Sequence, residues 1–203
     1  MRVYLYNYKH TCNISNSTLE HTRIIINVFY NWCKNNNLVT VNPCELINPI
    51  KVPKTKREPL DSMELELIRE ACENIREKAL VDFLYSTGCR VEETSMMKLS
   101  DIDWKSHCAE VRHGKGDKSR TVYFNPECEL SLKKYLKERT NKTEYVFSPT
   151  RKINTPYLSK RSIEKIISKI ASRVQLESGK HITPHIFRHT TATIALNNGM
   201  PVE

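Results

Sequence analysis

Near the end of the 203-residue chain lies the segment TPHIFRHTTATIALNNG, from Thr183 to Gly199, and its residue order predicts one helix. Thr183 suits the N-cap, and Pro184 suits the first helical position because its missing N–H would have no partner there. Gly199 suits the position just past the last turn, where the backbone often takes a left-handed conformation. The sequence therefore predicts a helix with defined ends over this segment.

One face of this predicted helix carries charge and titratable nitrogen. Successive helical residues turn by about 100°, so His185, Arg188 and His189 should share a face with Ala192. Core-anchoring side chains are expected at Ile186, Phe187, Ile194 and Ala195. An imidazole and a fixed cation near a helix N-terminus could bind phosphate, since that end also favours anions. A basic amphipathic helix with solvated charges explains this segment equally well.

Composition narrows the class of protein. There are 32 Lys and Arg against 23 Asp and Glu, a net charge of +9 that fits a polyanionic partner without proving one. Apolar runs of membrane-spanning length are absent from the sequence, and its first residues do not form a signal peptide. Seven scattered cysteines without a CxxC pair suggest reduced intracellular thiols, with neither a disulfide scaffold nor a zinc site.

The first 48 residues are predicted to hold about two helices. Residues 3–37 show apolar residues near helical spacing, namely Leu19, Ile24, Ile25, Val28, Phe29 and Trp32. Asn16 or Ser17 could cap the second helix, with Glu20 in its first turn. Two helices offer too little for an independent core, so this piece is expected to be a fragment, or a small domain completed by packing against something else.

The segment Asn48 to Pro59 is the clearest linker. It contains three prolines, which favour extended backbone, and four cations, namely Lys51, Lys54, Lys56 and Arg57. An ordinary solvated linker would look similar. So many cations in a short run favour contact with a nucleic-acid backbone.

After the linker, two helices lead to a turn that carries an arginine. Asp61 to Glu64 has the spacing of a capping box, and the second helix should end at Thr87-Gly88. Arg90 then lies in the turn before another helix, which Glu92 and Glu93 open. A turn arginine is usually just exposed, so Arg90 gains meaning only from what lies downstream.

A β-hairpin is predicted next. Residues 100–104 look turn-like, and residues 107–112 and 119–124 alternate as strands. The connection HGKGDK at 113–118 brings two glycines together with Lys115 and Lys118, and Arg120 follows it. Glycines allow close backbone approach and lysines supply charge, although the same turn also occurs without function. It is not a P-loop, because the required spacing is absent and a strand follows.

The remaining segments are mostly helical. Helices are predicted at 126–139 and 158–174, with an extended piece at 145–147. Ile163, Ile166, Ile167 and Ile170 should face inward on the second of these. Its polar face is mostly solvated, but Lys160 and Arg161 at its start could contact phosphates.

Taken together, these segments resemble the tyrosine recombinase (phage integrase) family. TGCRVEE at 87–93 resembles that family's TGxRxxE box, and HIFRHTTAT at 185–193 resembles its HxxRHT(x)AT box. The hairpin with Gly114-Lys115-Gly116 resembles the family's catalytic-lysine hairpin. The resemblance covers residues 59–203 well, and the first 50 or so residues resemble the later part of the family's helical core-binding domain.

The resemblance implies a mainly α fold with a small antiparallel sheet. It implies residues 1–48 as a partial core-binding domain, 49–58 as a basic linker and 59–203 as a catalytic domain. Both domains together would form a clamp on duplex DNA, where other recombinase subunits could join them, in the cytoplasm of a bacterium. No cofactor and no metal is implied, and no membrane partner.

The resemblance also implies roles for particular residues. Arg90 and Arg188 would hold the non-bridging oxygens of the scissile phosphate, and Lys115 would protonate the leaving 5′ oxygen. His185 would act in proton transfer or phosphate contact. Glu93 and His189 would hold these groups in place, and Lys118 and Arg120 would contact the DNA backbone. Phosphoryl transfer needs positioning and fixed positive charge above all, which suits two guanidiniums.

One expected residue is missing. The family's nucleophilic tyrosine follows the HxxRH helix, and none of the nine tyrosines here occupies that place. Tyr123, Tyr145 and Tyr157 are interpreted as packing residues. The chain is therefore expected to be inactive alone, with a truncated reading frame as the simplest reason and a tyrosine supplied by a neighbouring subunit as another.

Other functions remain open from the sequence. A non-catalytic DNA-binding remnant or regulator could occupy recombination sites. A metal-free phosphodiesterase could use His185 and Lys115 as acid and base. A type IB topoisomerase is disfavoured by the motif spacing and the helical N-terminal piece.

Overall fold

The computed structural model describes residues 1–53, 58–112, 119–150 and 155–200. The chain divides into two compact units, Met1–Arg57 and Glu58–Glu203. The boundary lies in the segment that the sequence suggested as a linker. The domain roles assigned to either side of it stay predictions.

The first unit contains two helices, α1 (Arg2–Cys12) and α2 (Asn16–Asn35). The predicted cap of α2 was wrong, because Ser15 takes this role in place of Asn16 or Ser17. Ser15 is extended, and its Oγ accepts a hydrogen bond from the Thr18 N–H at 3.1 Å. A Ser or Asn at three successive positions offers three caps of similar propensity, so the sequence alone could not fix the choice.

The apolar stripe of α2 is mostly uncovered. Leu19 is buried, but Ile24, Ile25, Val28, Phe29 and Trp32 are each between 45% and 62% exposed. Buried apolar side chains among the described residues of this unit are Leu5, Leu19, Cys33 and Cys44. The first unit therefore has very little core of its own.

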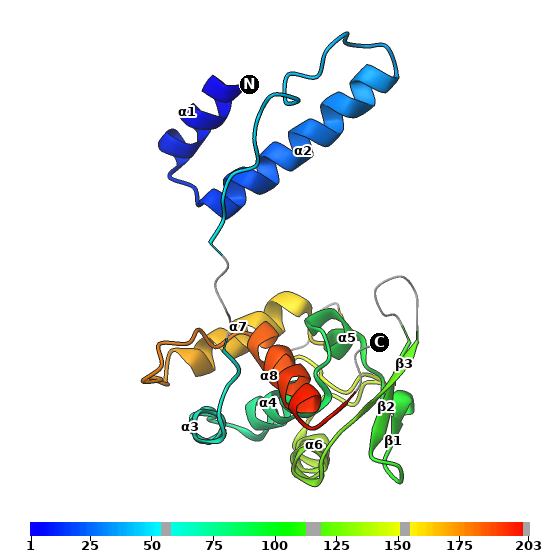
Figure 1. Ribbon diagram of the computed structural model, residues 1–203. Helices are drawn as coiled ribbons and strands as arrows, with labels where there is room; N and C mark the ends of the chain where they lie inside the picture. The colour runs from blue at the N-terminus through cyan, green and yellow to red at the C-terminus, as the bar shows by residue number, and fades with distance from the viewer. Residues whose placement is uncertain (54–57, 113–118, 151–154, 201–203) are drawn as a thin grey trace. The chain divides into compact units, whose positions relative to one another are not determined.

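The second unit is built around α4 (Ile75–Thr87), which packs against α6 (Pro126–Glu138), α7 (Lys160–Ala171) and α8 (Pro184–Asn197) (Figure 1). Most residues from Ala79 to Leu84 are fully buried, so α4 is covered on every side. The core cluster draws on all of these helices and on the sheet. α3 (Ser62–Glu70) begins with the predicted capping box between Asp61 and Glu64.

A three-stranded antiparallel sheet flanks the helices. β1 (Ile102–Asp103), β2 (Cys108–Val111) and β3 (Arg120–Tyr123) lie in the order β1-β2-β3, with Ala109 opposite both Ile102 and Val122. The hairpin strands were predicted, whereas the turn-like interpretation of 100–104 was wrong for Ile102–Asp103, which form a strand. Leu99–Asp101 form a 3₁₀ turn, and the two residues after it pair with β2. So short a strand leaves no readable alternation.

The helix predicted at Thr183–Gly199 is α8. Thr183 is its N-cap but makes no side-chain cap hydrogen bond, and Gly199 has the expected positive φ of 84°. Phe187 is completely buried, as expected of an anchor, but Ile194 is 38% exposed. The anchors of α8 therefore lie in its first half. The fold class is mainly α with one small antiparallel sheet, as the sequence predicted.

Candidate functional site

A tight turn between α4 and α5 (Val91–Met96) places the first arginine of the site. Gly88 ends α4 in the left-handed region at φ 59°, and its N–H donates to the Leu84 carbonyl at 3.1 Å. Arg90 then caps α5, and its backbone N–H donates to Glu93 Oε2 at 2.7 Å. Helix end, turn and helix start together fix the Arg90 backbone.

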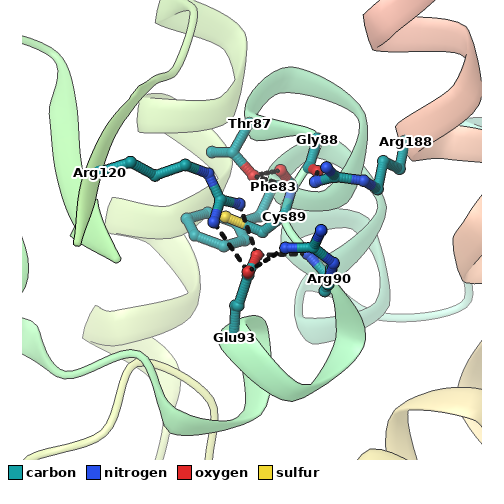
Figure 2. Close-up of polar contacts among 8 residues, drawn as sticks. All are labelled: Phe83, Thr87, Gly88, Cys89, Arg90, Glu93, Arg120 and Arg188. Carbon is teal, nitrogen blue, oxygen red and sulfur yellow. Dashed lines mark hydrogen bonds and ion pairs between the residues drawn. The ribbon is translucent and has the colours of Figure 1, made fainter. Parts of the chain in front are cut away.

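The second arginine, Arg188, comes from α8 and lies 100 positions after Gly88. Arg188 Nη1 donates to the Gly88 carbonyl at 2.5 Å, which ties α8 to the turn (Figure 2). Thr191, one turn later, donates to the Tyr85 carbonyl in α4 and is bonded to the Phe187 carbonyl at 2.9 Å. These contacts place Arg90 and Arg188 on neighbouring sides of one turn.

A third arginine completes the group from the sheet. Arg120 Nη1 and Nη2 donate to Glu93 Oε1 at 2.8 Å and Oε2 at 2.6 Å, a two-pronged ion pair. Arg90 Nη1 also donates to Oε1, at 2.9 Å. Figure 2 shows the Glu93 carboxylate between the guanidiniums of Arg120 and Arg90. Arg188 lies next to Gly88, beyond Arg90 and Cys89 as seen from Glu93.

The charges of this group do not balance. Burial alone would raise the pKa of Glu93, but hydrogen bonds from Arg120 and from the backbone and side chain of Arg90 lower it to about 2. Burial lowers the pKa of Arg188, as do the nearby charges of Arg90 and Arg120. Three guanidiniums therefore meet one carboxylate, and the local excess of positive charge suits an anion with several oxygens.

The two predicted histidines belong to the same helix as Arg188. His185 is exposed one turn before Arg188, on the side expected from helical spacing. His189 is half-buried directly after it. Both histidines therefore lie on the helix that carries Arg188, while their roles stay predictions.

The other predicted cations do not all meet at this place. Lys160 forms an exposed ion pair with Glu92 at 2.8 Å, and Arg161 is exposed at the start of α7. Lys51 belongs to the first unit. Lys54, Lys56, Arg57, Lys115 and Lys118 lie outside the described residues.

The packing interpretation of the tyrosines was right for two of the three. Tyr145 is 9% exposed and its ring centroid lies 5.2 Å from that of Tyr157. Tyr123, in contrast, is 66% exposed on β3. It alternates with buried Val122 and Phe124, so it faces the solvent side of the sheet.

Sequence reasoning missed the ion pair of Arg120, which had been assigned to the DNA backbone. The strand pattern contained the signal. Arg120 and Val122 are two residues apart on β3 and share the face of the sheet that packs on the helices. A cation on that face needs a buried carboxylate as partner, and Glu93 is 3% exposed at its side chain.

Three further observations concern metal ligands, the buried thiol and membrane-spanning helices. The described residues contain no group of three His, Cys, Asp or Glu side chains placed to hold a metal ion. Cys89 lies inside the site, but burial raises the pKa of its thiol to about 11, so it stays protonated. Within the described part of the chain, helices that could cross a membrane are also absent.

Fold and site together define a mainly helical domain with a small antiparallel sheet, in which three arginines from different elements lie around the Gly88 turn and Glu93. Residues 58–203 match the phage integrase family. The chain is 32% identical over 210 residues to tyrosine recombinase XerC of Listeria monocytogenes serotype 4b, covering 98% of this chain and 68% of the relative. The chain belongs to the phage integrase family, the tyrosine recombinases.

A second relative matches a shorter part of the chain. Tyrosine recombinase XerA of Pyrococcus furiosus is 33% identical over 159 residues, which cover 77% of this chain. This match spans 54% of the relative, so the chain accounts for about half of that protein's length.

Solved structures show the same fold. The crystal structure of XerA recombinase has a TM-score of 0.62 at 27% identity, covering 98% of this chain and 68% of that one. A lambda integrase dimer bound to a COC′ core site has a TM-score of 0.77 at 17% identity, covering 98% and 57%. At the second identity the likeness speaks for the fold alone.

Proposed function

We propose that this chain binds duplex DNA and activates one phosphodiester for strand exchange in site-specific recombination. The observation that carries the proposal is the convergence of Arg90 and Arg188 on the Gly88 turn. Two guanidiniums supply planar, permanently charged donors to the non-bridging oxygens of a phosphate. The match to tyrosine recombinases supports the same substrate class.

In this proposal each residue has a separate task. Arg90 and Arg188 hold the phosphate and stabilise the charge that develops on its oxygens. Lys115 protonates the leaving oxygen, and His185 contacts the phosphate or moves a proton. Glu93 and His189 keep the arginine group in place. A covalent link to DNA would conserve bond energy, so strands could be rejoined without ATP.

Other cations would extend the contact along the DNA. We assign Lys51, Lys54, Lys56 and Arg57 of the linker, and Lys118, Lys160 and Arg161 of the second unit, to the DNA backbone. Residues 1–48 would act as part of a core-binding domain and 59–203 as catalytic domain. Further recombinase subunits would assemble on the same DNA, as the lambda integrase dimer does on its core site, in the cytoplasm.

The proposal assigns no nucleophile to the 203 residues, since no tyrosine in the sequence occupies the family's position and the Cys89 thiol stays protonated. We therefore propose that a neighbouring subunit supplies the nucleophilic tyrosine.

The decisive experiment asks whether Arg90 and Arg188 together bind one particular phosphate of the duplex, which we call the gripped phosphate. Duplexes that bind the protein are selected from a random pool, and each backbone phosphate is then ethylated in turn. We expect one phosphate whose ethylation blocks binding of the wild type, and loss of that interference in Arg90→Ala and Arg188→Ala. Overall affinity should fall by only about tenfold, because other phosphate contacts remain.

Lys133→Ala provides the matched control, because Lys133 is exposed on α6 and pairs with Glu129. It should leave the interference pattern unchanged. If both arginine variants kept the wild-type interference pattern, the proposed phosphate site would be wrong. A nicked suicide duplex, tested in the presence of a tyrosine-bearing subunit, then separates two functions. A covalent protein–DNA adduct indicates an enzyme. A mobility shift without an adduct indicates a non-catalytic DNA-binding regulator.

A further inference from the structure

The Glu93 carboxylate is saturated by four hydrogen bonds. Oε1 accepts from Arg90 Nη1 at 2.9 Å and Arg120 Nη1 at 2.8 Å. Oε2 accepts from Arg120 Nη2 at 2.6 Å and the Arg90 backbone N–H at 2.7 Å. A carboxylate has about four acceptor sites, so Arg120 occupies half of them.

Arg120 and Arg90 use this carboxylate differently. Arg120 turns both terminal nitrogens to Glu93, whereas Arg90 turns only Nη1. Within the described part of the chain, Glu93 is the one carboxylate bound to the Arg90 side chain, which is 39% exposed. Arg90 therefore keeps outward-facing donors for a ligand because Arg120 already satisfies most of the buried charge.

We propose that Arg120 is a positioning residue, which fills the Glu93 carboxylate from strand β3 and thereby leaves the Arg90 guanidinium free for a phosphate. The inference rests on the proposed function. Without Arg120, a carboxylate that is 3% exposed would keep only the Arg90 contacts. The whole Arg90 guanidinium would then be drawn inward, because a buried charge with open acceptor sites costs free energy.

The pairing also links two parts of the chain. Arg120 opens β3, opposite Val111 of β2, and Glu93 lies in the first turn of α5. Arg120 thus ties the strand that follows the 113–118 connection to the turn that holds Arg90. A DNA-backbone contact by Arg120, expected from sequence, would need the same nitrogens that Glu93 occupies.

The first test measures the ionisation of Glu93 without DNA. The charged groups that face it are Arg90 at the N-cap of α5, Arg120 from β3, Arg188 from α8 and Glu92, and the titratable Cys89 thiol lies beside it. In the wild type, ¹³C-carboxylate NMR should find Glu93 ionised throughout pH 3 to 7. In Arg120→Gln the midpoint should rise by one unit or more, towards the ordinary value of about 4.3.

The second test measures phosphate contact on the selected duplex. Arg120→Gln should weaken the interference at the gripped phosphate and reduce affinity about tenfold. Arg120→Lys should restore part of the effect, since it returns the charge without the two-pronged geometry. Adding Glu93→Gln to Arg120→Gln should recover binding relative to Arg120→Gln alone, because the neutral amide no longer draws Arg90 inward.

The control is Arg112→Gln, an exposed arginine after β2 that pairs with Asp101 at 2.8 Å. This variant should change neither the titration midpoint of Glu93 nor the affinity for the selected duplex. If Glu93 stays ionised above pH 3 in Arg120→Gln while wild-type binding is intact, the role of Arg120 is refuted. A binding loss that persists unchanged beside Glu93→Gln would instead make Arg120 a direct DNA contact. Failure of the wild type to bind duplex DNA would overturn the proposed function itself, and with it any role of Arg120 in that function.

Discussion

Among single residues, the site depends on how the Glu93 carboxylate is shared, because Arg120 donates two side-chain hydrogen bonds to it and Arg90 donates one. Two arginines bind Glu93, and a third, Arg188, binds a backbone carbonyl. A carbonyl carries no net charge, so the positive charge of Arg188 is not cancelled by this contact. The group therefore keeps a net positive charge although it contains a carboxylate.

Gly88 gives a prediction at this scale. Its φ is 59°, and a Cβ there would lie 3.3 Å from Thr191 Cγ2, on the helix that carries Arg188. Gly88→Ala should therefore suffer backbone strain of about 1 kcal/mol and in addition push α8 away from the turn. We expect a lower free energy of unfolding in urea, and weaker interference at the gripped phosphate.

Gly179→Ala separates these two costs. Gly179 also has a positive φ, of 66°, but a Cβ there would meet nothing within 4 Å. Both variants restrict the unfolded chain equally, so that contribution cancels. Gly88→Ala should be the less stable by about 1 kcal/mol. Equal stabilities would show that the contact with Thr191 does not matter.

At the scale of elements, α8 fastens several segments at once. Besides its contacts with the α4 end, Thr190 Oγ1 accepts from the Leu60 N–H at 2.9 Å, in the buried approach to α3. Thr190 is fully buried and Leu60 is 4% exposed. A helix that positions Arg188 is therefore also tied to the start of the second unit.

Thr190→Val should test this tie. Valine has nearly the same shape but cannot accept a hydrogen bond, so the buried Leu60 N–H would lose its partner. An unsatisfied buried donor costs about 1–3 kcal/mol. We expect that loss in the urea-unfolding free energy, together with faster hydrogen exchange of the Leu60 amide.

The control for this variant lies one turn along the same helix. Thr193 Oγ1 bonds only the His189 carbonyl of its own helix, at 2.9 Å, among the described residues. Thr193→Val should change stability by no more than about 0.5 kcal/mol. The fastening role of Thr190 would be contradicted if both valine variants behaved alike.

Elements with local signals were predictable from sequence. The Asp61–Glu64 capping box, the Gly88 stop and the hairpin strands each depend on residues a few positions apart, and each was found. The two-residue strand β1 was not, since it exists only because β2 pairs with it. The exposure of Ile194 escaped prediction for a related reason, because helical spacing gives a face but not what packs on it.

At the scale of the whole molecule, the convergence of distant residues was inferred from motif resemblance and not from physics. Arg90 and Arg188 are brought together by packing of α8 on α4, which no local pattern reveals. The Arg120–Glu93 pair spans 27 positions and was missed, although the strand alternation pointed inward. Buried ion pairs need both partners placed before either can be interpreted.

The two units should differ sharply in stability when separated. The core cluster lies wholly between Leu60 and Phe187, with Phe83, Phe147 and Phe187 fully buried. In the first unit, Ile25, Phe29 and Trp32 are among the large apolar side chains that stay exposed. Burial of apolar area is the main drive for folding, and short chains with few buried side chains rarely fold alone.

We therefore predict that a 58–203 fragment unfolds in one cooperative thermal transition, within a few degrees of the main transition of the full chain. A 1–57 fragment should melt gradually by circular dichroism and bind a dye specific for exposed apolar surface. Helix propensity alone cannot give it a sharp transition, because most helical stability comes from packing of the apolar face. A sharp, dye-free transition of the 1–57 fragment at low concentration would contradict this. It would mean that Leu5, Leu19 and the buried Cys33 and Cys44 suffice as a core, and that the uncovered face of α2 needs no partner.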